Sequence, residues 1–439
     1  MSDPVPSQFL FATCQRGAEA ALKREVSQLI PGVHPAYMRP GFVTFKLPAA
    51  VSAEQFLVPA PVLARRWCAS LGKVSGQTIG ELANAVWQQV NPDEFVDLHL
   101  FLREDKWPGD TSENTLADEY LQQALPLMLS KFRERQQAES ALPAEKLDAV
   151  ETQPSKADGS AMMPSPEADT GHAVDLPATS DMSAAIDEVS ARDEDHPATS
   201  EEQNPTSATA PPRRPRSGAR AARRRTQMAT LPIEPTGARV LDLCPVSPTE
   251  WWLGWHRETT PDTLWPGGSF PEELPGGAIS RGYLKIREGL AWAGFRPQPE
   301  ERCVELGCAP GGASQALLDL GLLVVGVDPA DVDERLLSHP RFVHIAQRSN
   351  KVPRKAFLGI DWLFSDINLP PAYTLDTVEG ILEHPGVNFK GMLLTLKLGD
   401  WDLAAEIPAY LERIRSWQYA DVRARQLSLN RREICVAVS

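Results

Sequence analysis

Several features that mark other protein classes are missing from this sequence. No apolar run approaches the roughly 18 residues that span a bilayer, and the opening residues, MSDPVPSQFLFATC, lack the basic and apolar regions of a secretion signal. The six cysteines include no Cys-x-x-Cys pair, which argues against a disulfide framework and a thiolate zinc site. His344 and His384 have no companions at metal-ligand spacing. We therefore expect a soluble, cytoplasmic protein with reduced cysteines, no membrane partner and no catalytic metal.

A net positive charge is also missing. The formal net charge is −14, whereas affinity for nucleic acid rests largely on Lys and Arg side chains that neutralise phosphates. The negative charge is concentrated, because residues 134–202 hold 17 Asp and Glu against 4 Lys and Arg. The rest of the chain is only mildly acidic, so global charge does not exclude RNA as a partner.

Aromatic residues are almost absent from residues 138–236, which are rich in Ser, Pro, Ala and acids. Such a segment cannot bury enough apolar surface to offset the entropy of ordering it, so we predict a long disordered insert, first acidic and then Arg-rich. Two interpretations of its basic end stay open: a solvated tail neutralised by the preceding acids, or an arm that grips RNA. The arginines concerned are Arg213, Arg214, Arg216, Arg220, Arg223, Arg224 and Arg225.

The sequence on either side of the insert has the periodicity of folded domains. Residues 1–137 alternate short apolar strands with amphipathic helices, which predicts an α+β domain. Residues 237–272 contain the strand-like runs ARVLDLCPVS and EWWLGWHRE, which we assign to the closing strands of that domain and the segment that follows it. Four tryptophans here either pack in the core or stack on unpaired RNA bases: Trp251, Trp252, Trp255 and Trp265.

Residues 273–439 show a different and regular pattern. A helix over SRGYLKIREGLAWAG, with Ser280 as its cap, precedes the strand RCVEL, a glycine-rich bend and a second helix. Nearly all-apolar strands follow at LLVVGVD, RFVHIA, DWLFSD, GMLLTLKL, VRARQLS and EICVAV, with one further helix at LAAEIPAYLERIRSW. This alternation predicts a doubly wound α/β domain with a parallel sheet and an antiparallel edge.

The bend GCAPGG follows the first strand of this domain, where doubly wound sheets bind cofactors. Its spacing is neither GxGxxG nor a P-loop, which disfavours a pyrophosphate ligand. S-adenosylmethionine would suit this bend, because it lacks phosphates. Its ammonium group could face Glu305, and its ribose hydroxyls could donate hydrogen bonds to Asp328. The alternative is a tight helix start without a ligand. The candidate cofactor residues are Glu305, Gly307, Cys308, Pro310, Gly311, Gly312, Ala313 and Asp328.

Four further stretches resemble the FtsJ-like ribose 2′-O-methyltransferases: SRGYLKIRE, LFSDINLPP, LLTLKLGD and NRREICVAV. Within that family, the runs LWPGGSFPEELPGGAISRGYLKIREGLAW and RARQLSLNRREICV are similar to the bacterial 23S rRNA cytidine ribose 2′-O-methyltransferases. The resemblance is strong over about residues 240–439 and fainter over residues 8–133. It places four residues on the family's Lys-Asp-Lys-Glu tetrad: Lys285, Asp366, Lys397 and Glu433.

The resemblance implies a fold, a cofactor and a partner. The fold is a Rossmann-like S-adenosylmethionine-dependent methyltransferase domain, joined to an N-terminal α+β domain that is ferredoxin-like or THUMP-like. The cofactor is S-adenosylmethionine, and the partner is RNA, with a cytidine of 23S rRNA or its precursor as the acceptor. We expect the protein to act as a monomer.

The tetrad also makes chemical sense for this reaction. A ribose 2′-hydroxyl is a poor nucleophile, so the site has to lower its pKa or remove its proton as it attacks the methyl carbon. A buried lysine whose own pKa is lowered by desolvation can do either. We assign Lys397 as the base or pKa-lowering group and Asp366 as its electrostatic partner near the methyl, which makes it a cofactor contact too. Lys285 and Glu433 orient the others, although a surface salt bridge is the ordinary alternative for each residue alone.

Two departures from the family pattern concern the cofactor rather than the tetrad. Gln347 and Arg348 follow the third strand, where relatives usually have an acidic residue near the adenine, and Ala313 stands where they commonly have Trp. Two rival functions stay open: the same chemistry on tRNA or another RNA, and a non-catalytic RNA-binding or assembly protein that keeps the fold.

Overall fold

The computed structural model describes residues 7–49, 51–103, 113–140 and 235–439. The predicted insert and its arginine block lie outside these residues, except that positions 138–140 end a helix and 235–236 precede a strand. The six cysteines are free and buried. Within the described residues, no helix combines the length and the apolar character needed to cross a membrane.

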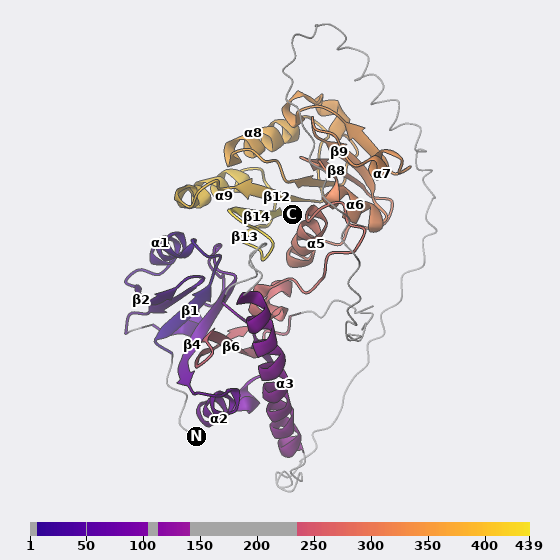
Figure 1. Cartoon of the computed structure of the whole chain (residues 1–439). Helices are drawn as coiled ribbons and strands as arrows, with labels where there is room; N and C mark the ends of the chain where they lie inside the picture. The colour runs from indigo at the N-terminus through magenta and orange to yellow at the C-terminus, as the bar shows by residue number, and fades with distance from the viewer. Residues whose placement is uncertain (1–6, 50, 104–112, 141–234) are drawn as a thin grey trace, which may run out of the picture. The chain divides into compact units, whose positions relative to one another are not determined.

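The described residues contain two seven-stranded sheets (Figure 1). The first has the order β2-β3-β1-β4-β7-β6-β5. Its neighbours pair antiparallel except β5 and β6, which run parallel. The strands are β1 (Phe9–Thr13), β2 (His34–Arg39), β3 (Phe42–Lys46), β4 (Arg66–Ser75), β5 (Asp97–Leu100), β6 (Arg239–Ser247) and β7 (Glu250–Arg257).

Three helices accompany the first sheet: α1 (Glu19–Leu29), α2 (Ile79–Gln89) and α3 (Glu113–Ser140). Helix α2 begins after Thr78, whose hydroxyl accepts the N–H of Glu81 and so satisfies one of the unpaired donors of the first turn. Its buried face includes Trp87, which stacks on Phe132 of α3 with ring centroids 6.2 Å apart. The two helices thus pack on each other through apolar side chains.

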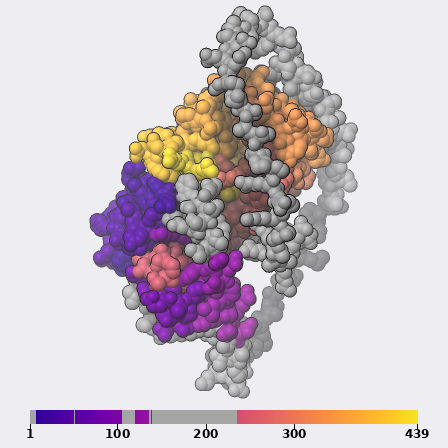
Figure 2. Space-filling view, in the orientation of Figure 1, coloured from indigo at the N-terminus to yellow at the C-terminus, as the bar shows by residue number. Residues whose placement is uncertain are grey.

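Strands β6 and β7 are far from β4 and β5 in sequence but lie between them in the sheet. Trp255 of β7 faces Ala69 of β4 in the pairing register, and Val240 of β6 faces Asp97 of β5. Figure 2 shows the same arrangement at the surface, where residues near 250 lie among those of the N-terminal region. The sequence before and after the insert therefore forms one sheet.

The tryptophans of this segment pack against protein side chains. Trp251 is fully buried, and its indole N–H donates to the hydroxyl of Tyr120 over 2.8 Å. Trp255 is also buried, beneath the guanidinium of Arg239. Trp252 packs on Tyr37 and Phe42, and Trp265 packs on Phe270. The packing interpretation of these residues accounts for their positions.

The second sheet has the order β10-β9-β8-β11-β12-β14-β13. Its first five strands run parallel, whereas β14 pairs antiparallel with both β12 and β13. This confirms the predicted Rossmann-like sheet with an antiparallel edge. The strands are β8 (Arg302–Leu306), β9 (Leu323–Val327), β10 (Phe342–Ile345), β11 (Trp362–Ser365), β12 (Gly391–Lys397), β13 (Val422–Arg425) and β14 (Glu433–Val438).

Helices pack in pairs around the second sheet, α5 with α6 and α8 with α9. Figure 1 shows the strands between these two pairs, as a doubly wound fold requires. Helix α5 begins one residue later than the predicted cap implies, although the Ser280 hydroxyl accepts the N–H of Gly282. The helices are α5 (Gly282–Ala293), α6 (Gly312–Asp319), α7 (Glu334–Leu337), α8 (Pro371–Leu382) and α9 (Ile407–Arg415).

Candidate active site

The glycine-rich bend joins β8 to α6 at the carboxyl ends of the parallel strands. The N–H of Gly307 donates to the carbonyl of Val327 at the end of β9, and the N–H of Asp366 donates to the carbonyl of Leu306. Gly307 has a positive φ of 84°, and a Cβ there would lie 2.9 Å from the carbonyl oxygen of Asp366. Only glycine therefore fits at this position, which brings the bend against the end of β11.

Acidic side chains surround this bend. Glu305 is 3% exposed, and its carboxylate accepts the hydroxyl of Ser314 over 2.5 Å. Burial raises the pKa of Glu305 to about 8, and the negative charges of Asp366 and Asp328 add to the rise. Asp328, at the end of β9, accepts the N–H groups of Ala309 and Ala330. A pocket of buried and clustered carboxylates disfavours further negative charge and favours a cationic ligand.

The residues present fit S-adenosylmethionine on this chemistry. That cofactor has a sulfonium and an ammonium group but no phosphate, and the bend offers bare backbone beside acids. Glu305 is placed to face a cation, while Asp328 lies at the end of the second strand, where a carboxylate accepts ribose hydroxyls. Cys308, Pro310, Gly311 and Gly312 complete the bend, and Ala313 lies in the first turn of α6. Gln347 and Arg348 follow β10.

Four side chains from four elements meet beside this bend. The ammonium of Lys285, on α5, lies 2.7 Å from a carboxylate oxygen of Asp366 and 2.7 Å from one of Glu433. The ammonium of Lys397, at the end of β12, lies 2.6 Å and 2.5 Å from the other oxygens of the same two carboxylates. We call these four residues the tetrad. Each lysine bridges both acids, so the charges balance within the group.

The tetrad is only partly enclosed. Side-chain exposure rises from 9% for Glu433 to 32% for Asp366, with both lysines between these values. Although burial raises the pKa of Asp366 and of Glu433, the neighbouring lysines lower both overall. The acids are therefore ionised and the group can contact a ligand from its open side.

From the sequence we assigned Lys285 an orienting role, and its surroundings keep it charged. Burial lowers its pKa, but the adjacent Asp366 and Glu433 carboxylates outweigh that effect and raise it overall. An ammonium between two ionised carboxylates is stabilised, not discharged. Lys285 therefore acts as a fixed positive charge.

A small cavity of about 40 Å³ joins the tetrad to the cofactor bend. Its wall includes Lys285, Glu305, Asp366 and Asn430. Asn430 is 4% exposed and its amide donates to a carboxylate oxygen of Glu433 over 3.4 Å. The sequence reasoning did not single out Asn430, although its place three residues before Glu433 in NRREICVAV could have suggested it.

A second group of ionisable side chains lies in the first sheet, around the fully buried Asp242. Its carboxylate pairs with His256, accepts the thiol of Cys68 over 3.2 Å, and lies 3.8 Å from Nε of Arg66 and Nδ1 of His99. We call this the Asp242 cluster. Cys68, Asp242 and His256 are near enough for a metal ion, but the Arg66 guanidinium already supplies positive charge there.

Comparison with known proteins agrees with this geometry. Residues 278–381 match the model of the FtsJ-like methyltransferase family. This range includes Lys285, Asp366 and the whole cofactor bend.

Curated relatives match part of this chain. The Ribosomal RNA large subunit methyltransferase M of Pseudomonas fluorescens (strain SBW25) is 30% identical over 191 residues, which are 40% of this chain and 51% of that protein. The protein of the same name from Halorhodospira halophila is 34% identical over 106 residues, 24% of this chain and 31% of that one. The match thus spans about half, or less, of the relatives' length.

Among solved structures, the Methanococcus jannaschii fibrillarin pre-rRNA processing protein covers 45% of this chain and 81% of its own, at 11% identity and a TM-score of 0.28. So loose a superposition carries no argument. The family match and the sheet order are what support a Rossmann-like methyltransferase domain.

Proposed function

We propose that this protein transfers a methyl group from S-adenosylmethionine to a ribose 2′-hydroxyl of RNA, with a cytidine of 23S rRNA as the acceptor. The observation that carries the proposal is the tetrad, which is assembled at the carboxyl ends of parallel strands. It lies beside a glycine-rich bend whose spacing does not suit a pyrophosphate ligand. The relatives named for large-subunit ribosomal RNA support the choice of RNA. The N-terminal region would then hold the RNA.

In this proposal the residues of the bend hold the cofactor. Glu305 faces its ammonium group, Asp328 accepts its ribose hydroxyls, and the backbone from Gly307 to Gly312 lies against it. When bound, the cofactor supplies a methyl group on a positively charged sulfur. Asp366 lies next to both the bend and the lysines. It therefore stands between the residues that would hold the methyl donor and those that would activate the acceptor.

The tetrad activates the acceptor. In the transfer, an oxygen–carbon bond would form as the carbon–sulfur bond breaks and leaves a neutral thioether, and the hydroxyl proton would pass to solvent at the open side of the site. Lys397 is a paired cation at the open side of the site, so it stabilises the developing alkoxide and thereby lowers the pKa of the hydroxyl. Lys285 and Glu433 keep Lys397 and Asp366 in place.

Methyl transfer from labelled S-adenosylmethionine tests the proposal. The purified protein is incubated with RNA from a strain lacking the gene, and 2′-O-methyl positions are mapped. We expect label in 23S rRNA with the wild type and a loss of at least about a hundredfold with Lys397→Ala. Lys390→Ala is the matched control, because Lys390 precedes the opposite end of β12 and is exposed.

The other outcomes decide between the rivals. Label confined to tRNA would refute 23S rRNA as the acceptor but support the proposed methyl transfer. Cofactor binding without transfer to any RNA would refute catalysis and favour a binding or assembly protein. Equal activity of Lys397→Ala and the wild type would refute the role of the tetrad.

A further inference from the structure

The loop of residues 426–432, between β13 and β14, sets the position of Glu433. Within it, the side-chain oxygen of Asn430 accepts the N–H of Leu427 over 2.9 Å, and the side-chain amide of Gln426 donates to the carbonyl of Arg431 over 2.7 Å. The amide of Asn430 reaches Glu433 itself. The shape of this loop therefore fixes both a member of the tetrad and a wall of its cavity.

Helix α5 holds the loop from one side. Glu288 is 1% exposed, and its carboxylate accepts three bonds: the N–H of Ser428 over 2.7 Å, the hydroxyl of Ser428 over 2.6 Å and the N–H of Leu429 over 2.9 Å. Glu288 lies three residues after Lys285 on the same helix, so the two side chains share a face. The helix that supplies Lys285 to the tetrad thus also anchors the loop that supplies Glu433.

The N-terminal region holds the loop from the other side. The guanidinium of Arg65 donates to the carbonyls of Ser428 over 3.3 Å and Asn430 over 3.4 Å, and Arg65 is buried. In return, the N–H of Gln426 donates to the carbonyl of Val62 over 2.7 Å, and the guanidinium of Arg425 donates to the carbonyl of Arg65. Residues from β13 and from the chain before β4 therefore bind each other reciprocally.

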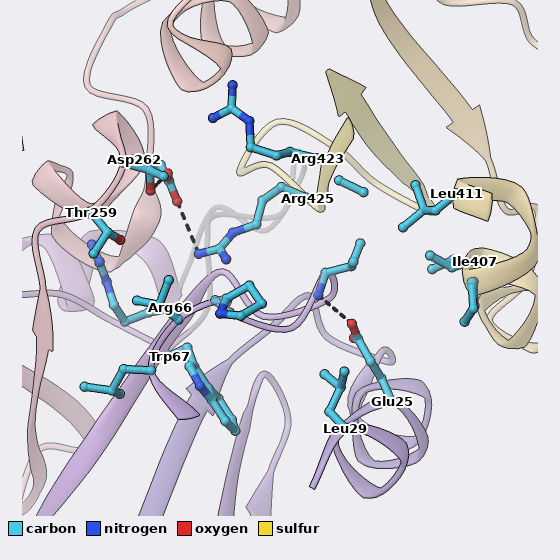
Figure 3. A pocket seen from close by; sticks show the side chains of 18 of the residues that line it. Glu25, Leu29, Arg66, Trp67, Thr259, Asp262, Ile407, Leu411, Arg423 and Arg425 are labelled. Atoms are coloured by element: carbon cyan, nitrogen blue, oxygen red, sulfur yellow. Dashed lines mark hydrogen bonds and ion pairs between the residues drawn. The ribbon is translucent and has the colours of Figure 1, made fainter. Parts of the chain in front are cut away.

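Arg425 strengthens this contact at its base. Its guanidinium lies 3.2 Å from the carboxylate of Asp262, and both side chains border a cavity of about 790 Å³ that Glu25 and Arg66 also line (Figure 3). Charges buried this deeply are strongly destabilised when a partner is lost. The ion pair therefore keeps β13, and with it the start of the loop, fixed against the segment that follows β7.

We propose that Arg65 is a positioning residue for Glu433 and Asn430, so that the N-terminal region forms part of the methyl-transfer site as well as the RNA grip. This rests on the proposed function. Arg65 binds the two carbonyls that flank Leu429, and Glu288 binds the N–H groups of the same segment from the opposite side. Loss of Arg65 leaves the loop held from one side only. A shift of about 1 Å in a reacting group can lower a rate about a hundredfold.

The test compares Arg65→Ala with Arg24→Ala. Arg24 is a matched control because it also joins the two regions, through the carbonyl of Trp401 and the carboxylate of Asp402, but does not contact the loop. We expect Arg65→Ala to lower kcat about ten- to a hundredfold, with changes of less than about threefold in the KM for RNA and in the Kd for S-adenosylmethionine. Arg65→Lys, which keeps a donor of similar reach, should recover part of the loss. Arg24→Ala should keep the wild-type kcat.

Hydrogen exchange provides a readout that does not depend on activity. The N–H groups of Leu427, Ser428 and Leu429 should exchange at least about tenfold faster in Arg65→Ala and at the wild-type rate in Arg24→Ala. If the wild type methylates no RNA, the proposed function fails, while this measurement still decides whether Arg65 holds the loop. An unchanged kcat, a loss confined to the KM for RNA, an equal loss in both variants, or unchanged exchange would each overturn the proposal.

Discussion

The tetrad and the Asp242 cluster are built from similar side chains but differ in their access to solvent. Asp242 is fully enclosed by protein, since its side chain and that of Arg66 have exposures of 0% and 2%. In the tetrad, Asp366 keeps 32% of its side chain exposed and faces a cavity shared with the cofactor bend.

This difference teaches how to separate structural from functional charge. In the Asp242 cluster, a carboxylate with a lowered pKa is enclosed by Arg66, His256, His99 and Cys68, and burial together with Arg66 lowers the pKa of His99 to about 3. Such a group has no room for a substrate. The tetrad has balanced charges and an open side, which is what a ligand requires.

The largest effect we predict comes from breaking the closed cluster. Asp242→Ala leaves Arg66 and His256 without their buried carboxylate, so the free energy of unfolding should fall by about 3 to 5 kcal/mol. Urea denaturation measures this, and the exposed Asp93→Ala is the control. Methyl transfer per folded molecule should be unchanged, and a variant as stable as the wild type would contradict our reading of the cluster.

A slightly smaller effect should follow from a substitution in the tetrad. Asp366→Asn removes the charge that both lysines share, so kcat should fall about a hundred- to a thousandfold, and the pKa of Lys285 should fall because one of the charges that raise it is lost. Steady-state kinetics over a pH range measures both. The free energy of unfolding should change far less than in Asp242→Ala. The opposite pattern, with stability lost and activity kept, would reverse our assignment of the two groups.

The pH dependence of stability tests the comparison at Glu305, because this carboxyl is buried but lies beside the partly exposed tetrad. Its pKa is raised to about 8 from an ordinary value of 4.5, so the folded protein binds this proton more tightly than the unfolded chain does. Its contribution to stability is therefore fully present below pH 4.5 and is lost as pH rises through 8. Between pH 5.5 and 7.5 the free energy of unfolding of the wild type should fall by about 2 to 3 kcal/mol relative to that of Glu305→Gln, since one pKa unit corresponds to about 1.4 kcal/mol.

Calorimetry provides a second measurement on Glu305. A cationic ligand beside the carboxylate lowers its pKa, so binding of S-adenosylmethionine near neutral pH should release a proton. Titrations in two buffers with different ionisation enthalpies detect this release, which should vanish in Glu305→Gln. Binding without proton release in the wild type would show that Glu305 does not face the ammonium group.

The smallest effect should come from the charge group in which the lysine is largely exposed. Lys390 is 54% exposed and pairs with Glu301 and Asp361. Exposed pairs contribute about 0 to 1 kcal/mol, so Lys390→Ala should change the free energy of unfolding by less than about 1 kcal/mol in urea denaturation. A larger loss would mean that exposure alone does not distinguish the clusters.

The strands and the tetrad could be predicted from the sequence because their signals are local. The apolar runs of the second sheet leave little choice of element, and Lys285, Asp366, Lys397 and Glu433 each lie in a short recognisable stretch. Helix α8 was not predicted, because the prolines of its start in LPPAYT resemble a turn. Strand β2 was also missed, since HPAYMR is mostly polar and its side chains are largely exposed.

Contacts between distant residues that lie in no recognisable motif could not be predicted. Cys68 and Asp242 are 174 positions apart, and Arg65 and Asn430 are 365 positions apart. No periodicity or spacing relates such pairs, and a buried Glu such as Glu288 looks in the sequence like any polar residue of a helix. These residues became visible only once the strands had been placed beside one another.

The order of strands in the first sheet also constrains how the protein is made. When the ribosome has released residues 1–103, β2, β3, β1 and β4 can pair, but the other edge of β4 and the whole of β5 still lack their partners. Those partners, β6 and β7, end only at Arg257. The nascent chain therefore carries an unpaired sheet edge while more than a hundred further residues are translated. Such an edge can pair with the wrong strand and can be bound by chaperones.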